Sequence, residues 1–399
     1  MKMLPASGPV MGKDFFNREE EIKDLLRLLE RENIVLISPR RYGKTSLMRE
    51  LGRRLSERGQ LCLFLDVMHI DAPEDFVIEL ATAAFDVTNV RKKFAKSLKG
   101  AFIRLSTLFD EIEATVAGTG IKVKFRKGLN DEIGKDNWTE KGKNIFDAIK
   151  SMSNEKPIYV VIDELSECIN NMIKRKKNAK KFLQWFRSIR QQTIQDLRFV
   201  VGGSVSFDRV VRGIPGLPLI NDFKRVCVEC FSREDALKFI EKGFIEEEIE
   251  YREEIGVKIV ECIGEPYVPF FTAIFLRMTL QEAGAHITKE IIEEAYNSKL
   301  LGAQGKGYFE HYKERLRIYY DEIMAKAAKW ILKKACVDDR GIPKQLAFNL
   351  FREATGTVDE ERFVDLLYDL ENDFYIKFDG ENIRFQSKVL RDWWRLYHV

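Results

Sequence analysis

The segment Ser38-Pro39-Arg40-Arg41-Tyr42-Gly43-Lys44-Thr45 carries more information about fold than any other stretch of this chain. It follows the apolar, β-branched run 33–37 and precedes a run of good helix formers that ends at Leu51. A strand, a loop that ends in Gly-Lys-Thr and a helix, in that order, form the pattern of a phosphate-binding P-loop. The sequence therefore predicts a nucleotide site at the start of this helix.

Each part of the loop has an expected role. Backbone N–H groups and the helix N-terminus would face the phosphates. Gly43 would allow a close approach of the backbone, Lys44 would reach the β- and γ-phosphates, and the Thr45 hydroxyl would bind Mg²⁺. The residues expected to contact the nucleotide are Ser38, Pro39, Arg40, Arg41, Tyr42, Gly43, Lys44, Thr45 and Ser46.

The motif departs from its usual form at one position. Ser38 stands where the first glycine belongs, so a residue that permits positive φ is absent. We expect a tighter loop, which affects the rate of hydrolysis more than binding.

A second motif is acidic. The apolar run 158–162 ends in Asp163 and Glu164. In a P-loop NTPase an acid at the end of a parallel strand holds Mg²⁺, which fits Asp163. A second acid beside it can polarise the attacking water, which fits Glu164 as a catalytic base. The alternative is a strand that ends in solvated acids, but the order and spacing of the two motifs favour an NTPase.

Composition sets the outer limits of the interpretation. The chain has 399 residues, of which 45% are hydrophobic and 32% charged, with a net charge of +3. This length suits two or three globular domains, and the small net charge does not by itself mark a nucleic-acid binder. The N-terminus lacks the apolar region of a signal peptide and no run is long enough to span a membrane, so a cytoplasmic protein is expected.

Six cysteines in a chain of this length do not indicate a disulfide framework. Cys62 and Cys227 lie in apolar, strand-like runs and are expected to be reduced core thiols. The spacing Cys227-Val-Glu-Cys230 has no second Cys or His pair nearby, so a core position is favoured over a zinc site.

Five strand-like runs separated by helical ones predict an α/β fold with a parallel sheet and helices on both faces. These runs are 33–37, 61–66, 158–163, 197–204 and 225–230. The acidic strand is not the one that directly follows the P-loop, which is typical of ATPases with an additional strand. Asn17, with Glu20 three residues later, is expected to cap the helix before the P-loop strand, and residues 115–125 are expected to form a small hairpin.

Three domains are predicted: an ATPase core over 1–230, a helical lid over 231–304 and a winged helix-turn-helix over 305–399. Ser232 would cap the first lid helix, and Gly264-Glu265-Pro266 interrupts the lid. In the last segment one helix runs to Lys334, a second starts near Pro343 and a third opens with a capping box over Thr357–Glu360. A β-hairpin over 374–385 would form the wing.

These motifs together resemble the archaeal-type predicted ATPases, a branch of the STAND class of AAA+-related P-loop NTPases. Phe16-Asn17-Arg18-Glu19 is similar to the opening box of that family, and two arginines precede its Gly-Lys-Thr as they do here. Asp163-Glu164, Gly203-Ser204, Gly264-x-Pro266 and the closing Val389-Leu390-Arg391-Asp392-Trp393-Trp394 also match in order.

The resemblance implies ATP and Mg²⁺ as ligands, with an αβα core, a helical lid and a C-terminal winged helix. It places Arg18 near the adenine or ribose, Pro266 against the nucleotide from the lid, and Ser204 as the polar sensor that acts in catalysis. Arg209 or Arg212 would supply positive charge to the γ-phosphate; the alternative for each is a solvated or ion-paired arginine. Arg277 lies near the place of a second sensor but has no assigned role.

The charged runs in the remaining segments indicate whether the partner is a nucleic acid or a protein. The run Lys174-Arg175-Lys176-Lys177, like Arg91, Lys92, Lys93 and Lys96, is either a solvated face or a contact for nucleic acid or an acidic partner. The third helix of the predicted winged domain carries six acids against Arg362, namely Asp359, Glu360, Glu361, Asp365, Asp369 and Glu371. Because phosphates would repel this helix, we expect a protein-contact or autoinhibitory element instead of a DNA reader.

Three functions remain open at this stage. The first is an ATP-driven switch with slow hydrolysis, a protein partner and nucleotide-dependent self-association. The second is a DNA-associated loader similar to origin-recognition or transposition ATPases. The third is a nucleotide-binding scaffold without hydrolysis, which only Ser38 favours.

Overall fold

A computed structural model describes residues 8–90, 105, 107, 112–117, 120–125, 133–152, 156–204, 210, 214, 220–282 and 286–399. The chain divides into two compact units. The N-terminal unit comprises Pro9–Ser38 and Lys44–Val228, and the C-terminal unit comprises Glu229–Val399 together with the loop Pro39–Gly43. The two units are described separately below.

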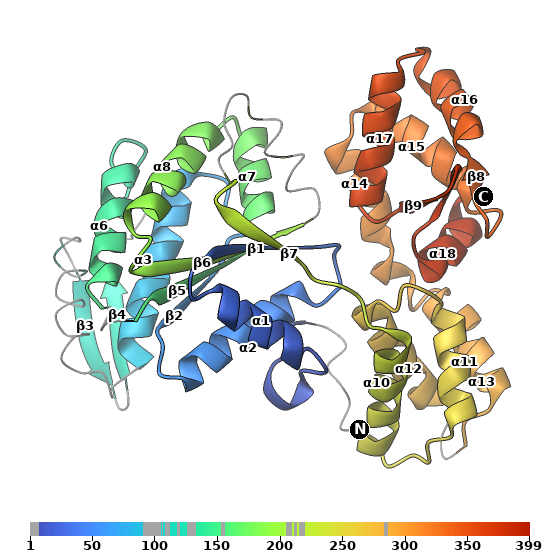
Figure 1. The fold of residues 1–399 in the computed structure, drawn as a ribbon, viewed down its shortest axis with the longest axis horizontal. Helices are drawn as coiled ribbons and strands as arrows, with labels where there is room; N and C mark the ends of the chain where they lie inside the picture. The colour runs from blue at the N-terminus through green and yellow to red at the C-terminus, as the bar shows by residue number, and fades with distance from the viewer. Residues whose placement is uncertain are drawn as a thin grey trace. The chain divides into compact units, whose positions relative to one another are not determined.

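A five-stranded sheet forms the centre of the N-terminal unit (Figure 1). Its strands are β1 (Asn33–Ser38), β2 (Cys62–Asp66), β5 (Ile158–Asp163), β6 (Leu197–Ser204) and β7 (Phe223–Cys227). They run parallel in the order β2-β5-β6-β1-β7, so β6 lies between the P-loop strand and the acidic strand. The predicted parallel sheet with an additional strand is confirmed.

Successive side chains of a strand point to opposite faces of the sheet, and both sets are apolar here, so both faces of this sheet must be covered. Val35 and Ile37 of β1 belong to one apolar cluster, whereas Ile34 and Leu36 belong to another. The first cluster is completed by α3 (Pro73–Val90), α6 (Trp138–Lys150), α7 (Leu165–Lys174) and α8 (Ala179–Gln192). The second is completed by α1 (Glu19–Leu28) and α2 (Lys44–Glu57), which lie on the other face (Figure 1).

Local features of this unit agree with the sequence in part. The expected hairpin forms as β3 (Ile112–Ala117) and β4 (Gly120–Phe125), paired antiparallel. The expected N-cap at Asn17 is wrong, because α1 begins at Glu19 and its N-cap is Arg18. Asn17 instead adopts φ 41, in the left-handed region where asparagine is tolerated better than most residues. A short 3₁₀ turn, η1 (Gly12–Asp14), precedes it.

The first half of the C-terminal unit is helical. Its helices are α10 (Arg233–Glu246), α11 (Glu253–Ile263), α12 (Pro269–Glu282), α13 (Lys289–Glu294), the π-helical segment η3 (Ala295–Leu300) and the 3₁₀ turn η4 (Lys306–Tyr308). The expected Ser232 cap is present, since Ser232 accepts a hydrogen bond from the Asp235 N–H and forms a full capping box with it.

The second half mixes helices with a small sheet. It contains α14 (Glu310–Tyr319), α15 (Glu322–Ala335), β8 (Ile342–Pro343), α16 (Lys344–Thr355), α17 (Glu360–Asn372), β9 (Ile376–Asp379), β10 (Asn382–Phe385) and α18 (Lys388–His398). The strands pair antiparallel in the order β8-β10-β9, so the expected hairpin is present. The cap of α17 is Asp359, which accepts from the Arg362 N–H, and not the predicted Thr357.

All six cysteines are free thiols, but one expected position is wrong. Cys227 is exposed because it points outward from β7, the edge strand, while Cys230 is half-buried. Among the described residues no cluster of three or more His, Cys, Asp and Glu side chains could hold a metal ion. Within the same residues, no helix combines the length and apolarity needed to cross a membrane.

Candidate nucleotide-binding site

The first turn of α2 and the end of β5 bring the two predicted motifs together. Thr45 Oγ1 donates a 2.6 Å hydrogen bond to Asp163 Oδ2. Lys44 Nζ lies 3.8 Å from Asp163 Oδ1 and 3.4 Å from Glu164 Oε1. Lys44 and Asp163 are almost completely buried, at 7% and 2% exposure. A lysine buried at this depth requires counter-charge, and the two carboxylates supply it.

The oxygen atoms of this cluster suit a hard divalent cation. Magnesium is usually held by one or two carboxylates together with waters and substrate phosphates, not by a cage of protein ligands. Thr45 and Asp163 present hydroxyl and carboxylate oxygens at one point. Ser38 Oγ and Glu164 Oε2 are buried without a hydrogen-bond partner in the described structure, which leaves two polar atoms for a bound ligand to satisfy. The residues therefore fit Mg²⁺ with a phosphate chain.

Glu164 has an unusual backbone. It adopts φ 57 and ψ 35, the left-handed conformation, directly after the last residue of β5. Its N–H donates a 3.0 Å hydrogen bond to Asp163 Oδ1, which fixes the orientation of that carboxylate. A non-glycine residue in this region costs about 1–2 kcal/mol, and such strain tends to collect at functional sites. The conformation places two neighbouring carboxylates on the same lysine.

Gly202 is a site residue that the sequence analysis missed. It lies in β6, where a Cβ atom would come within 2.6 Å of Asp163 Oδ1 and 2.8 Å of Met48 Sδ. The glycine therefore leaves room for the Asp163 carboxylate beside the neighbouring strand. The run Val201-Gly202-Gly203 gave a hint, because glycine within a strand often marks a close approach of other groups.

Ser38 lies at the end of a strand, and the effect that its substitution for glycine would have on hydrolysis remains a prediction. It is the last residue of β1 and pairs in register with Ser204 of β6, so its backbone is that of an ordinary strand. The positive φ angles of the loop fall on Arg41, at 73°, and Gly43, at 87°. The side chain of Ser204 and all of Arg209 and Arg212 lie outside the described residues, so their predicted roles remain predictions.

The loop residues Pro39–Gly43 group with the C-terminal unit. The Arg41 guanidinium lies 3.9 Å from the centroid of the Phe270 ring, and its Nη2 lies 3.4 Å from His311 Nδ1. Burial, and then the neighbouring charge of Arg40, lower the pKa of Arg41. Tyr42 meets Phe374 edge-on, with the ring centroids 4.9 Å apart.

Two other predicted residues belong to the same unit. Pro266 follows the end of α11, and Arg277 of α12 lines a small pocket with Glu246 and Glu247. None of these contacts tests a role in nucleotide binding.

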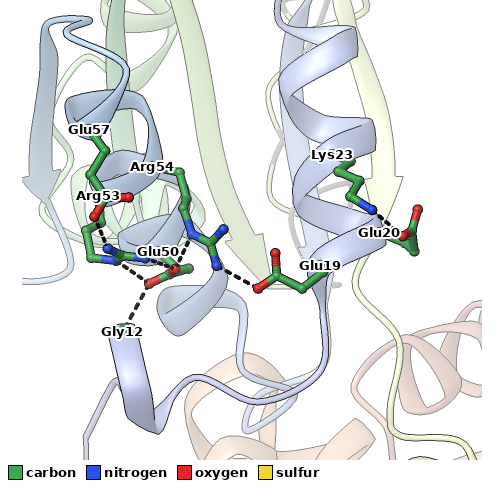
Figure 2. A network of polar contacts seen from close by, with 8 residues as sticks. All are labelled: Gly12, Glu19, Glu20, Lys23, Glu50, Arg53, Arg54 and Glu57. Atoms are coloured by element: carbon green, nitrogen blue, oxygen red, sulfur yellow. Dashed lines mark hydrogen bonds and ion pairs between the residues drawn. The ribbon is translucent and has the colours of Figure 1, made fainter.

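Arg18 lies in the N-terminal unit, where it is 5% exposed, and its Nη1 is 3.4 Å from Glu21 Oε1. Next to it, Glu19 joins a polar network on α2 that the sequence analysis also missed (Figure 2). Glu50 is its centre: it is fully buried and accepts hydrogen bonds from Gly12, Arg53 and Arg54. In the sequence, a glutamate among arginines on a helix is typical of a surface ion pair, so the pattern did not indicate that Glu50 is buried.

Comparison with known proteins agrees with this geometry. The chain is similar to the Walker-type ATPase PABY2304 of Pyrococcus abyssi, with a TM-score of 0.66 at 19% identity, over 98% of each chain. The ORC2 protein of Aeropyrum pernix, in its ADPNP-ADP complexes, gives a TM-score of 0.60 at 10% identity, over 96% of this chain and 92% of that one. At these identities the similarity establishes the P-loop ATPase fold.

Sequence comparison identifies the family. An uncharacterized ATP-binding protein of Methanocaldococcus jannaschii, MJ1010, is 27% identical over 261 residues, which are 60% of this chain and 64% of that protein, just under two thirds. The model of a family described as an ATPase domain predominantly from Archaea matches residues 15–267, more than half of the chain. The chain therefore belongs to this archaeal ATPase family.

Proposed function

We propose that this protein is an ATP-binding and ATP-hydrolysing molecular switch of the STAND type. The observation that carries the proposal is the buried cluster in which Lys44 contacts both Asp163 and Glu164 while Thr45 bonds Asp163. These four residues supply a counter-charge for phosphate, oxygen ligands for Mg²⁺ and a base, which are the parts that phosphoryl transfer to water requires.

Each residue has one task in the proposed reaction. Lys44 exchanges its carboxylate partners for the β- and γ-phosphate oxygens. Thr45 and Asp163 would hold Mg²⁺, which neutralises phosphate charge when bound. Glu164 orients a water molecule and accepts its proton as the water oxygen attacks the γ-phosphorus, and the bond to the ADP oxygen breaks. Expected turnover is slow, as in an enzyme whose nucleotide state is the signal.

The switch part of the proposal rests on the family resemblance. We infer that residues 231–304 act as a lid in which Pro266 contacts the nucleotide. We also infer that residues 305–399 form a winged helix-turn-helix whose position changes with that of the lid. A γ-phosphate that binds one arrangement better than another shifts the population toward it. The four helices and three short strands after residue 320 support the winged-helix interpretation.

The outward face of α17 supports a protein partner. Val364 and Tyr368 stand one turn apart and are 48% and 53% exposed. Glu361 and Asp365 are exposed on the same face. Apolar side chains framed by carboxylates suit a basic, amphipathic segment of another protein and disfavour a phosphate backbone.

Limited proteolysis of the full chain tests the switch. We expect Mg²⁺-ATP to protect residues 231–304 from cleavage relative to Mg²⁺-ADP, and Pro266→Ala to weaken this protection more than it lowers the melting temperature. The control is Pro343→Ala, at the N-cap of α16, which should leave the protection by Mg²⁺-ATP unchanged. Identical cleavage patterns with ATP, ADP and no nucleotide would contradict the switch.

A DNA-associated ATPase is the second candidate. It is favoured by the fold shared with the Aeropyrum pernix ORC2 protein and by the exposed face of α15, where Lys326, Lys333 and Lys334 accompany Trp330. Lys326 Nζ lies 4.9 Å from the Trp330 ring centroid. We place a non-hydrolysing scaffold third, because Ser38, the one residue that favours it, is the last residue of strand β1.

A further inference from the structure

The charged residues of α15 and α17, two helices of the C-terminal unit, are sorted by sign (Figure 1). Between Glu322 and Ala335, α15 carries four lysines and one acid, Glu322. Between Glu360 and Asn372, α17 carries five acids and one basic residue, Arg362. Most of these charges therefore have no opposite charge one turn away on their own helix.

Four exposed side chains of α15 form a stripe along one face of the helix. Ile323, Lys326, Trp330 and Lys333 follow one another at intervals of three or four residues, so they lie on the same face. Ile323 is 52% exposed and Trp330 is 37% exposed. Lys326 and Lys333 stand on either side of the indole, two turns or about 10 Å apart along the helix. We call these four residues the basic stripe.

The exposed face of α17 has the same construction with the opposite charge. Glu361, Val364, Asp365 and Tyr368 also follow at helical spacing and are all exposed. Val364 and Tyr368 supply the apolar surface, and the two carboxylates lie beside it. We call these four residues the acidic stripe.

The charges of both stripes are available to a partner. Within the described part of the chain, no ion pair engages Lys326, Lys333, Glu361 or Asp365. Positive charge also accumulates around α15, because burial lowers the pKa of Lys329, and the charges of two neighbouring basic residues of α14 lower it further. An opposite charge brought to either stripe would therefore be attracted.

Each stripe is the chemical complement of the other. Both are exposed in the same chain, so they do not cover each other, but α15 of a second copy can reach α17 of the first. With Trp330 packed against Val364 and Tyr368, the lysines on either side of the indole come within reach of the carboxylates. Aromatic anchors of this kind carry much of the affinity at protein interfaces.

The pair of stripes also argues against a nucleic acid as the common occupant. Phosphates are attracted to the basic stripe but repelled by the acidic one. A second copy of the chain satisfies both stripes at once. Copies related by a twofold axis make the contact twice, and copies arranged head to tail make it once.

We propose that the chain associates with itself by docking the basic stripe of one copy onto the acidic stripe of another. This inference rests on the proposed function only for the protein contact assigned there to α17. It requires no bound nucleotide, so its failure would leave the proposed ATPase activity to be decided by its own assays.

Charge reversal in the full chain tests the docking. One variant carries Glu361→Lys with Asp365→Lys, and the other carries Lys326→Glu with Lys333→Glu. Sedimentation velocity without nucleotide, at concentrations up to about 100 μM, should show wild-type association that weakens as salt is added. Each variant alone should associate at least about tenfold more weakly, because like charges then face each other.

Mixing the two variants is the decisive step. Each supplies the charge that the other lacks, so an equimolar mixture should regain the association that both have lost. The matched control is Glu241→Lys with Glu294→Lys, which changes the net charge equally at two exposed acids on α10 and α13. The control should associate like wild type, and its mixture with the lysine-reversed variant should regain nothing.

Each other result overturns the inference. A wild-type chain that stays monomeric at every concentration excludes a second copy as the occupant. Association that neither variant weakens assigns the contact to another surface. If a reversed variant has a lowered melting temperature, Glu361→Gln with Asp365→Asn replaces it, and wild-type association in that variant would also exclude the acidic stripe. A monomeric chain that binds single-stranded or duplex DNA through Lys326 and Lys333 would assign the basic stripe to nucleic acid.

Discussion

The charge of Lys44 is balanced by Asp163 and Glu164 in the structure, and a bound triphosphate would replace these partners. We therefore predict that Lys44→Ala abolishes measurable ATP binding, because the phosphate charge then lacks its main side-chain counterion. Glu164→Gln should retain ATP binding but hydrolyse it at least about tenfold more slowly, as expected for the loss of a positioned base. Calorimetry and phosphate release measure the two effects.

The control for this pair is Glu167→Gln, a buried acid in the first turn of α7. It should leave the hydrolysis rate per bound nucleotide unchanged. Wild-type turnover in Glu164→Gln would show that Glu164 is structural and that another group activates water.

Glu50 also gives a prediction for stability against pH. Its pKa in the folded chain is about 2, below its ordinary value of 4.5. A depressed pKa means that the ionised network stabilises the fold above about pH 4.5, and that this stabilisation is lost as the pH falls toward 2. The melting temperature of Glu50→Gln should therefore lie below that of wild type at pH 7, and the difference should shrink from pH 5 to pH 3. Glu57→Gln should show a small difference at every pH, and a constant gap for Glu50→Gln would exclude this linkage.

At the scale of secondary-structure elements, β5 and β6 are close enough beside the site that only glycine fits at position 202. Gly202→Ala should push its new methyl group into the Asp163 carboxylate and Met48, since a Cβ would lie 2.6 Å from Asp163 Oδ1. We expect the Mg²⁺ concentration for half-maximal hydrolysis to rise about tenfold, because Asp163 is moved from its ligand position. Titration of activity with Mg²⁺ measures this shift.

A clash of equal size elsewhere provides the control. Gly142→Ala would place a Cβ 2.6 Å from the Trp185 ring, between α6 and α8 and away from the carboxylates. It should lower the melting temperature without changing the Mg²⁺ dependence of the folded fraction. If both variants shift the Mg²⁺ dependence equally, the effect of Gly202→Ala is general strain and not displacement of Asp163.

At the scale of the whole molecule, the distribution of charge separates the two candidate functions. In the basic run after α7, Arg175 lies 3.1 Å from Asp71 and Lys177 lies 3.6 Å from Glu74, so only part of its charge is available to a phosphate backbone. We predict weak duplex-DNA binding by the full chain at physiological salt, with a shallow salt dependence. Fluorescence anisotropy over a salt series measures both.

Two variants locate any DNA contact. Replacing Lys174 and Lys176 by Ala should flatten the salt dependence if the run contacts phosphates. Glu361→Gln with Asp365→Asn should strengthen binding if α17 repels the duplex. Tight, sequence-specific binding by the wild-type chain that these α17 changes leave intact would promote the DNA-associated function over the switch.

The sequence alone determined the P-loop, the acidic strand and the presence of five strands in a parallel sheet, because each depends on local pattern: apolar strand periodicity, a glycine before lysine, and carboxylates at a strand end. Only the tertiary structure decided which residues support that site. Gly202 matters because β6 passes beside β5, and Glu50 matters because the segment before α1 returns onto α2. Cys227 is exposed because β7 is an edge strand. Such contacts can join residues more than 100 positions apart, as between Met48 and Gly202. Hydrophobic periodicity specifies which face of an element is buried, but it does not specify which group packs against that face.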